Sequence, residues 1–221
     1  MSSLAPESSA DKRAPKRSGY RPKRSQAERR ESTQSSILNA AIKVLLEKGY
    51  ANFTTAEVAK RAGVSRGAQM NYFRTRDDLI LATGRYTLAR STEEAVAFAE
   101  QSISTRSTLT AFLQNSERFF LGEHYTAMME VTVAARTDPK IAREIVSLLT
   151  RYRRALNDIW IEAFCEAGYD RKSVVELIKL TNHIYRGMAL TAVWAQNKDE
   201  DRKLRSLWGR LTKELLERKR L

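Results

Sequence analysis

Residues 54–73 read TTAEVAKRAGVSRGAQMNYF, and this stretch decides the fold. Thr54 can cap a helix, and Glu57, three residues later, supplies the other half of a capping box. Gly63 is the residue type that ends a helix in a tight turn, and Ser65 can cap the helix that follows. Two short helices joined by a glycine-containing turn predict a helix-turn-helix.

The residue types within this stretch fit two helices that pack against each other. The small residues expected at a close helix crossing are Ala59, Ala62 and Gly67. The apolar residues expected to fix the crossing angle are Val58, Val64 and Phe73. Gln69 precedes Phe73 by four residues, so it shares the inward side of its helix, where we expect a structural role. The same helix then presents Arg66, Met70 and Asn71 outward.

The segments on both sides of this stretch supply the walls that it needs. Apolar residues at helical spacing predict a helix over 34–48, ended by Gly49. A further helix is predicted to start near Thr75, because Asp77 and Asp78 then lie in its first turn, where the helix dipole favours anions. Two short helices cannot bury a core alone, so we expect helix 34–48 to cover them.

The rest of the chain also has the pattern of helices, and no stretch alternates with the period of a strand. The predicted helices are 105–121, 124–136, 139–167, 170–196 and 200–218. The fold class is therefore all-α, with an N-terminal three-helix helix-turn-helix domain followed by a helical body. The predicted division is a disordered basic arm over 1–31, a helix-turn-helix domain over 32–92 and a helical body over 93–221.

Composition narrows the class of protein. The net charge of +13 attracts nucleic acid, an anionic membrane or an acidic partner, and charge alone does not choose among them. Cys165 is the single cysteine, so the chain has neither an intrachain disulfide nor a cysteine zinc cluster. No apolar run is long enough to span a bilayer, and the N-terminus lacks the apolar segment of a signal peptide. We therefore expect no membrane partner and a cytoplasmic, nucleoid-associated location.

The first thirty residues carry nine Lys and Arg against three Asp and Glu, with few large hydrophobic residues. One interpretation is a solubilising tail. The other is an arm that follows the DNA backbone or enters a minor groove. The basic residues that would make those contacts are Arg13, Lys16, Arg17, Arg21, Lys23 and Arg24.

The helix-turn-helix stretch resembles the N-terminal signature of the tetracycline-repressor (TetR) family, and the preceding residues 37–50, ILNAAIKVLLEKGY, resemble the family's first helix. The positions in register with the signature are Thr54, Val58, Ala59, Ala62, Gly63, Val64, Ser65, Gly67, Phe73, Arg76 and Leu79. The departures are Gln69 for the usual Leu, Met70 for Tyr, Tyr72 for His, and Arg76 for Lys. The fold is expected to survive these changes, whereas the base preference cannot be copied from relatives.

The resemblance implies that the second helix of the motif enters the major groove of DNA. Arg66 is the first candidate for a base contact because Arg reads guanine bidentately, and Asn71 is the next, facing adenine or a phosphate. Met70 can press on a thymine methyl group. Thr54, Tyr72 and Arg76 are expected to position the DNA backbone, with Ser65 as a cap that also reaches phosphate; packing is the alternative for Tyr72.

The resemblance also implies a homodimer formed by the last two helices. The candidate interface residues are Leu177, Ile184, Met188, Leu204, Leu207, Trp208 and Leu211. The alternative is that these helices complete the core of a single subunit.

A small-molecule effector is implied between the middle helices of the body, in a pocket built from large residues. The candidates are Phe120, Met128, Met129, Trp160, Phe164, His183, Arg186 and Trp194, each of which has a plain core position as its alternative. The basic residues on these helices suggest an aromatic or acidic effector; they are Arg118, Arg136, His183 and Arg186.

The function predicted from the sequence is a dimeric repressor that an effector releases from a palindromic operator. A helical nucleoid protein that binds DNA by charge alone is the first alternative. An enzyme is the second, but His124 and His183 are the only histidines, and no phosphate-binding loop or metal-ligand spacing is present. We expect no catalytic residue, metal or cofactor.

Overall fold

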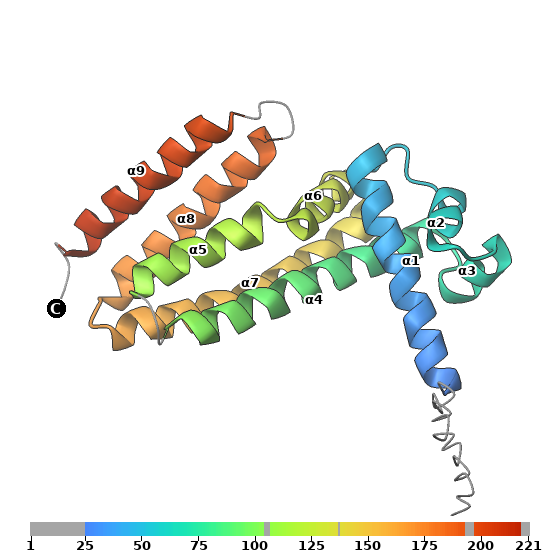
Figure 1. Cartoon of the computed structure of the whole chain (residues 1–221), viewed down its shortest axis with the longest axis horizontal. Helices are drawn as coiled ribbons and strands as arrows, with labels where there is room; N and C mark the ends of the chain where they lie inside the picture. The colour runs from blue at the N-terminus through green and yellow to red at the C-terminus, as the bar shows by residue number, and fades with distance from the viewer. Residues whose placement is uncertain (1–24, 104–106, 137, 193–196, 218–221) are drawn as a thin grey trace, which may run out of the picture.

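The computed structural model describes residues 25–103, 107–136, 138–192 and 197–217, which form helices and no strand (Figure 1). The helices of these residues are α1 (Gln26–Lys48), α2 (Thr55–Ala62), α3 (Arg66–Tyr72), α4 (Arg76–Ile103), α5 (Thr108–Phe120), α6 (Glu123–Ala135), α7 (Pro139–Glu166), α8 (Arg171–Thr191) and α9 (Lys198–Glu217). The all-α fold class expected from the sequence is confirmed. None of these helices combines the length and apolarity that crossing a bilayer requires.

Helix α1 begins earlier than the sequence analysis placed it. Residues 26–31, expected to belong to a disordered arm, form its first turns. The cause is a reciprocal capping box: the amide of Glu28 donates to Ser25 Oγ at 3.1 Å, and the amide of Ser25 donates to Glu28 Oε2 at 2.7 Å. The rest of the arm, including the basic residues from Arg13 to Arg24, lies outside the described residues.

The other differences concern helix ends. Helix α4 continues without a break through residues 92 and 93, so the expected domain boundary falls inside one helix. Helix α8 ends at Thr191, whereas the sequence pattern predicted a helix to residue 196. Residues 193–196, which include the pocket candidate Trp194, lie outside the described part of the chain.

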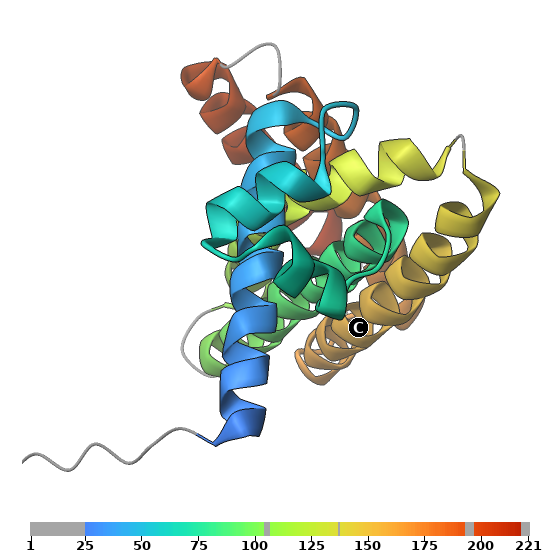
Figure 2. The same cartoon turned by 90° about the vertical axis from the view of Figure 1, so that its right-hand side faces the viewer.

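The helices are arranged along one long axis. Figure 1 shows α4 and α7 running beside each other along the body, with α2 and α3 at one end and α8 and α9 at the other. Seen from the helix-turn-helix end, α1 crosses the front of the body next to α2 and α3 (Figure 2). The motif is therefore presented at the tip of the molecule.

The hydrophobic core consists of two clusters of buried side chains. The first joins α1 to the body: Ile37 and Ile80 lie in it with Met128 of α6 and Ile145 of α7. The second, around Trp160, lies between α5, α7, α8 and α9. Residues of the helix-turn-helix belong to the same buried cluster as residues of α6 and α7, and α1 and α4 lie between the motif and these two helices.

Gly84 marks the place where α4 lies closest to its neighbours. A Cβ atom there would lie 3.1 Å from Cδ1 of Ile145 and 3.5 Å from Cγ1 of Val131. A side chain would push α4 away from α7 and α6, so glycine permits this close packing.

Candidate functional site

The motif at the tip is built by local hydrogen bonds. Thr54 Oγ1 accepts from the amide of Glu57 at 3.2 Å and starts α2, and Gly63, in the left-handed region with φ of 70°, ends it. Ser65 Oγ accepts from the amide of Ala68 at 3.1 Å and starts α3. The helix-turn-helix expected from the sequence is therefore present.

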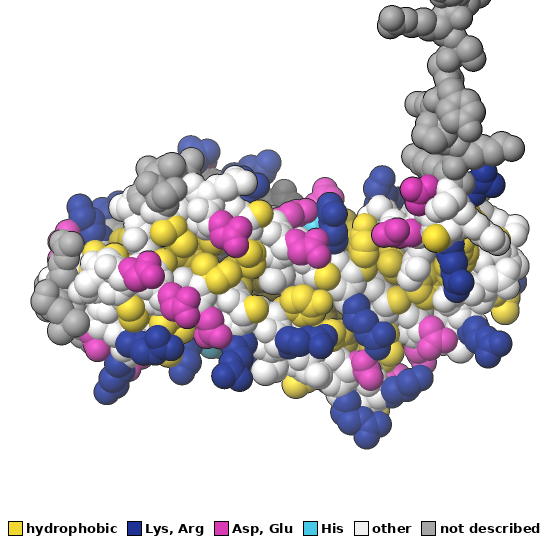
Figure 3. All heavy atoms as spheres, turned by 90° about the horizontal axis from the view of Figure 1, so that it is seen from below, with side chains coloured by type: hydrophobic (Ala, Val, Ile, Leu, Met, Phe, Trp, Pro, Cys, Tyr) yellow, Lys and Arg dark blue, Asp and Glu magenta, His cyan; other side chains and the backbone are white. Residues whose placement is uncertain are grey.

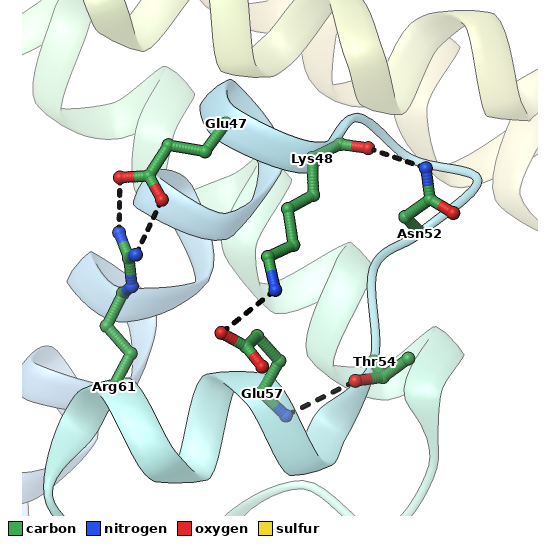
Figure 4. A network of polar contacts seen from close by, with 6 residues as sticks. All are labelled: Glu47, Lys48, Asn52, Thr54, Glu57 and Arg61. Atoms are coloured by element: carbon green, nitrogen blue, oxygen red, sulfur yellow. Dashed lines mark hydrogen bonds and ion pairs between the residues drawn. The ribbon is translucent and has the colours of Figure 1, made fainter.

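The expected capping box of α2 is only half formed. The carboxylate of Glu57 turns away from the backbone of Thr54 and pairs with Lys48 Nζ at 3.0 Å (Figure 4). Arg61 forms a second ion pair with Glu47, so charged pairs tie α2 to the end of α1. The hydrogen bond from Arg61 lowers the pKa of Glu47, and the one from Lys48 lowers the pKa of Glu57. The ion pair between Glu57 and Lys48 therefore replaces the Glu57 half of the capping box, whereas Thr54 keeps its half.

The outward side of α3 is open for recognition. Arg66 and Asn71 are exposed, and Met70 is 49% exposed. Arg66 forms no ion pair with any residue in the described ranges. Gly67 lies on the same side, and a Cβ there would meet nothing within 4 Å. The expectation that Gly67 sits at the helix crossing is therefore wrong. Because Gly67 has no side chain, a bulky partner can come close to the backbone of α3 at this position.

Gln69 faces the opposite way, as its spacing from Phe73 predicted. Its side chain is fully buried, and Nε2 donates to the backbone oxygen of Phe73 at 3.2 Å. Its Oε1 has no hydrogen-bond partner within the described residues. A buried acceptor without a donor costs about 1–3 kcal/mol, so Gln69 weakens the motif that it helps to build.

Replacing Gln69 by Leu is expected to raise the free energy of unfolding by about 1 kcal/mol, because the variant removes an unsatisfied acceptor and keeps the buried volume. Urea unfolding of the two proteins measures the difference. DNA affinity should stay unchanged, since the side chain does not reach the outward side of α3. A destabilised Gln69→Leu protein would show that the hydrogen bond from Nε2 to Phe73 contributes more than the unsatisfied Oε1 costs.

Arg76 has a structural role that the sequence analysis did not predict, and its expected phosphate contact stays a prediction. Its Nε donates to the oxygen of Phe53 at 2.9 Å and its Nη2 to that of Tyr50 at 2.6 Å, and the guanidinium lies 4.2 Å from the centre of the Tyr50 ring. These carbonyls belong to the loop between α1 and α2, where no helix supplies hydrogen-bond donors to the backbone oxygens. Arg76 therefore holds this loop against the start of α4.

The turn between α3 and α4 contains a basic residue that the sequence analysis missed. Arg74 is exposed and lies in the turn between the end of α3 at Tyr72 and the start of α4 at Arg76. Its position in the sequence, shortly after the second helix of the motif, is the signal that could have identified it as a candidate. Tyr72 is half-buried against the core with its ring 6.5 Å from that of Phe73, which favours packing over a phosphate contact.

A cavity of about 290 Å³ lies inside the body, between α4, α5, α6, α7 and α8. Five of the residues expected to form a pocket line it: Phe120, Met128, Met129, Trp160 and Arg186. The sequence analysis missed further lining residues, among them Leu88, Phe112, Asn115, Tyr125, Arg153 and Asn182. The middle helices and α4 thus line one cavity, and the role of this cavity as an effector pocket stays a prediction.

Two expected pocket residues lie elsewhere. Phe164 is fully buried between the rings of Phe112 and Tyr169, 5.6 and 5.8 Å away, and belongs to the core. His183 is exposed, because it lies on the side of α8 that faces away from the body. Arg118 packs on the ring of Phe98 at 4.9 Å outside this cavity.

The cavity lining is mostly apolar, and its polar groups range from the buried Asn115 to the exposed Arg153. Asn115, 1% exposed, donates from Nδ2 to the oxygen of Ala95 at 2.8 Å, while its Oδ1 has no partner within the described residues. The guanidinium of Arg186 lies 5.7 Å from the ring centre of Phe120. Burial raises the pKa of Tyr125, and the adjacent Arg186 partly opposes this. An apolar space with a few such groups is typical of a small-molecule site.

One hydrogen bond joins the wall of the cavity to the helix-turn-helix. Glu130 Oε2, on α6, accepts from the amide of Tyr50 at 2.9 Å. Met128 and Met129, on the same helix, line the cavity. The loop between α1 and α2 is therefore held by α6 through Glu130 and by α4 through Arg76, and both helices line the cavity.

The end of the molecule formed by α8 and α9 carries exposed leucines. Three of the expected interface residues, Leu204, Leu207 and Leu211, are 42–45% exposed. The remaining leucines of this surface are Leu180, Leu190 and Leu215, which the sequence analysis did not select. We call these six residues the leucine surface.

The other expected interface residues lie mostly inside the subunit. Leu177, Met188 and Trp208 are buried, and Ile184 is half-buried. Trp208 Nε1 donates to Thr181 Oγ1 at 3.2 Å, which fixes α9 on α8. The expectation that these three buried residues face a second subunit is wrong, because Leu177 and Met188 of α8 and Trp208 of α9 are covered within the subunit itself.

A helix-turn-helix at the tip of a helical body with an internal cavity defines a DNA-binding transcriptional regulator. Residues 37–83 match the family model described as bacterial regulatory proteins, tetR family. The chain is 32% identical over 184 residues to the HTH-type transcriptional regulator CymR of Pseudomonas putida, covering 83% of this chain and 91% of that protein. The chain belongs to the tetR family.

Solved structures show the same fold along nearly the whole chain. A putative TetR-family regulator from Mesorhizobium loti superposes with a TM-score of 0.70 at 15% identity, covering 87% of this chain and 99% of that one. A putative transcriptional regulator from Saccharomonospora viridis, solved in complex with choline, gives 0.64 at 15% identity, covering 85% and 96%. At these identities the similarity establishes the fold of the body, not its ligand.

Proposed function

We propose that this protein is a dimeric repressor that binds a palindromic operator and leaves it when a small effector occupies the cavity of the body. The observation that carries the proposal is the connection of two sites through one loop. Residues 49–53 adjoin the reading motif and are held by Arg76 and Glu130, on helices that line the cavity. The solved regulator that holds choline supports a small-molecule role for the body.

The DNA contacts are proposed from exposure and hydrogen-bonding capacity. Arg66 reads guanine, Asn71 reads adenine or bonds to phosphate, and Met70 packs on a thymine methyl group. The exposed Arg74 supplies a phosphate contact, since two of the nitrogens of Arg76 hold the loop. The exposed Thr54 contributes to backbone positioning at the start of α2.

The proposed dimer uses the leucine surface. Its residues are exposed on α8 and α9, and pairing with a second copy would bury them in a four-helix bundle. An isologous contact of this kind places two α3 helices on one duplex, with half-sites about one helical turn or more apart. We keep the division proposed from the sequence, with residues 32–92 for DNA binding and 93–221 for effector binding and dimerisation.

The charge distribution argues against a nucleoid protein that binds by charge alone. Figure 3 shows Lys and Arg side chains spread over one whole face of the described body, interspersed with Asp and Glu. Binding by charge alone would favour a continuous basic surface. The ordered, open side of α3 supports recognition of sequence.

Effector release is proposed to pass through Glu130. An effector that displaces α6 pulls on the amide of Tyr50 and changes the angle at which the motif meets the groove. Since coupling energies in such regulators are about 1–3 kcal/mol, a single contact that transmits the shift has a measurable share.

Replacing Glu130 by Ala is therefore expected to reduce effector-induced release, lowering the ratio of operator dissociation constants with and without effector by roughly 2- to 30-fold. Affinity for the effector should stay close to that of the parent, because Glu130 does not line the cavity. Fluorescence anisotropy on labelled operator gives the ratio. Glu123→Ala on the same helix is the control, and an unchanged ratio in Glu130→Ala would assign coupling to α4 alone.

The proposed function is tested by sequencing genomic fragments that the purified protein retains at about 150 mM salt, where charge-only binding is weak. One enriched palindrome supports a specific repressor and supplies the operator for the measurements above. Uniform recovery of all fragments, both before and after dialysis of the protein to remove bound small molecules, would contradict it.

A further inference from the structure

Among the described residues that line the cavity, two carry a positive charge and none carries a negative one. Arg186 of α8 and Arg153 of α7 are the two, and no Asp or Glu is found among these described lining residues. Arg153 is exposed, which places it at the mouth, whereas Arg186 is half-buried beside the aromatic rings. The charges therefore come from two helices that line one cavity.

No ion pair within the described ranges neutralises either charge, since none involves Arg153 or Arg186. The phenol of Tyr125 lies next to Arg186, and burial raises its pKa, so this partner is neutral at physiological pH. A half-buried guanidinium without a counter-charge attracts an anion more strongly than an exposed one does, because the surrounding dielectric is lower.

The rest of the cavity suits an apolar group. Leu88, Phe112, Phe120, Met128 and Trp160 are all buried and line it. The rings of Phe112 and Trp160 meet edge to face with centroids 5.5 Å apart, which forms an aromatic wall. The unpartnered Oδ1 of Asn115, in a side chain 1% exposed, offers one acceptor to a bound molecule.

We propose that the cavity binds an amphipathic monoanion, a carboxylate on an aryl or alkyl body, with the carboxylate on Arg186 and Arg153 and the body against the aromatic wall. The assignment rests on the proposed function only for the step from binding to DNA release. The binding of the anion is inferred from the residues that line the cavity alone.

The test compares three probes that differ only in their end group: 4-phenylbutyrate, 4-phenylbutanamide and 4-phenylbutylamine. Isothermal titration calorimetry on the full chain is expected to show the acid binding at least about tenfold more tightly than the amide or the amine. Arg186→Gln should remove this preference, Arg153→Gln should reduce it, and Arg186→Lys should restore part of it.

Arg154→Gln is the matched control, since Arg154 neighbours Arg153 on α7 but its side chain is 84% exposed and lies outside the cavity. It should bind the acid as the parent does, and circular dichroism checks that each variant is folded. An amide or amine that binds as tightly as the acid, or a preference that survives in Arg186→Gln, overturns the assignment.

Operator release measured with the same three probes separates this assignment from the proposed function. If the acid binds with the expected preference but leaves the operator complex intact, the anion site stands and effector release by this class of ligand fails. If only the amine or the amide releases the operator, effector release stands and the anionic ligand is excluded.

Discussion

Replacing Arg66 by Ala is expected to weaken operator binding by about 1–3 kcal/mol, roughly 5- to 150-fold, and to relax selectivity at one base pair of each half-site. The guanidinium stands on the first turn of α3, is exposed and forms no ion pair with the other described residues, so its donors are free for a base edge. Its removal costs no packing, and the stability of the fold should not change.

Anisotropy titrations on the operator, on single-base variants and on random DNA measure this effect. Arg74→Ala is the contrasting variant: without a phosphate-binding side chain at this position, the protein should bind all sequences more weakly and to the same degree, and the salt slope should fall by about one. Equal losses of affinity on operator and random DNA in Arg66→Ala would assign Arg66 to the DNA backbone and remove the base-reading role.

The elements predicted best are those that neighbouring residues determine. Thr54, Gly63 and Ser65 act within a few residues of themselves, so the sequence was enough to place the caps and the turn of the motif. The start of α1 was missed although Ser25 and Glu28 form the same kind of cap, because no apolar period accompanies them.

The contacts that the sequence did not predict join residues that are far apart in the chain. Arg76 reads as a phosphate ligand by resemblance, but its donors meet the carbonyls of Tyr50 and Phe53, which only the packing of α4 on the loop brings near. Glu57 likewise finds Lys48 instead of its local cap. A pattern along one helix does not reveal which tertiary acceptors compete for a side chain.

The cavity shows the same limit. Met128 and Trp160 were expected there because they are large and lie on middle helices, yet Phe164, one turn beyond Trp160, faces the core and His183 faces outward. The side of a helix that meets a cavity depends on its rotation against several neighbours. Arg153 could have been predicted as a lining residue from the sequence, since it stands at helical spacing between the lining residues Leu149 and Leu156.

The leucine surface gives the prediction with the largest effect. The double replacement Leu207→Glu and Leu211→Glu is expected to convert the protein to a monomer, because it would place two carboxylates from each copy in an apolar interface. Operator affinity should fall by about 10²- to 10⁴-fold, since each subunit then binds one half-site without the gain from the second. Sedimentation velocity gives the oligomeric state, and anisotropy gives the affinity.

The control is Val146→Glu, which changes a 61% exposed hydrophobic residue on α7, outside the leucine surface. It should leave both the oligomeric state and the affinity unchanged. The double variant should remain folded, because Leu207 and Leu211 are 42% and 43% exposed and contribute little to the subunit core. On DNA that carries a single half-site, one subunit of the double variant should bind with the same affinity as one subunit of the parent. Equal affinities there separate loss of dimerisation from damage to α3. A double variant that still sediments as a dimer would place the interface on another surface, and with it the spacing of the two reading helices.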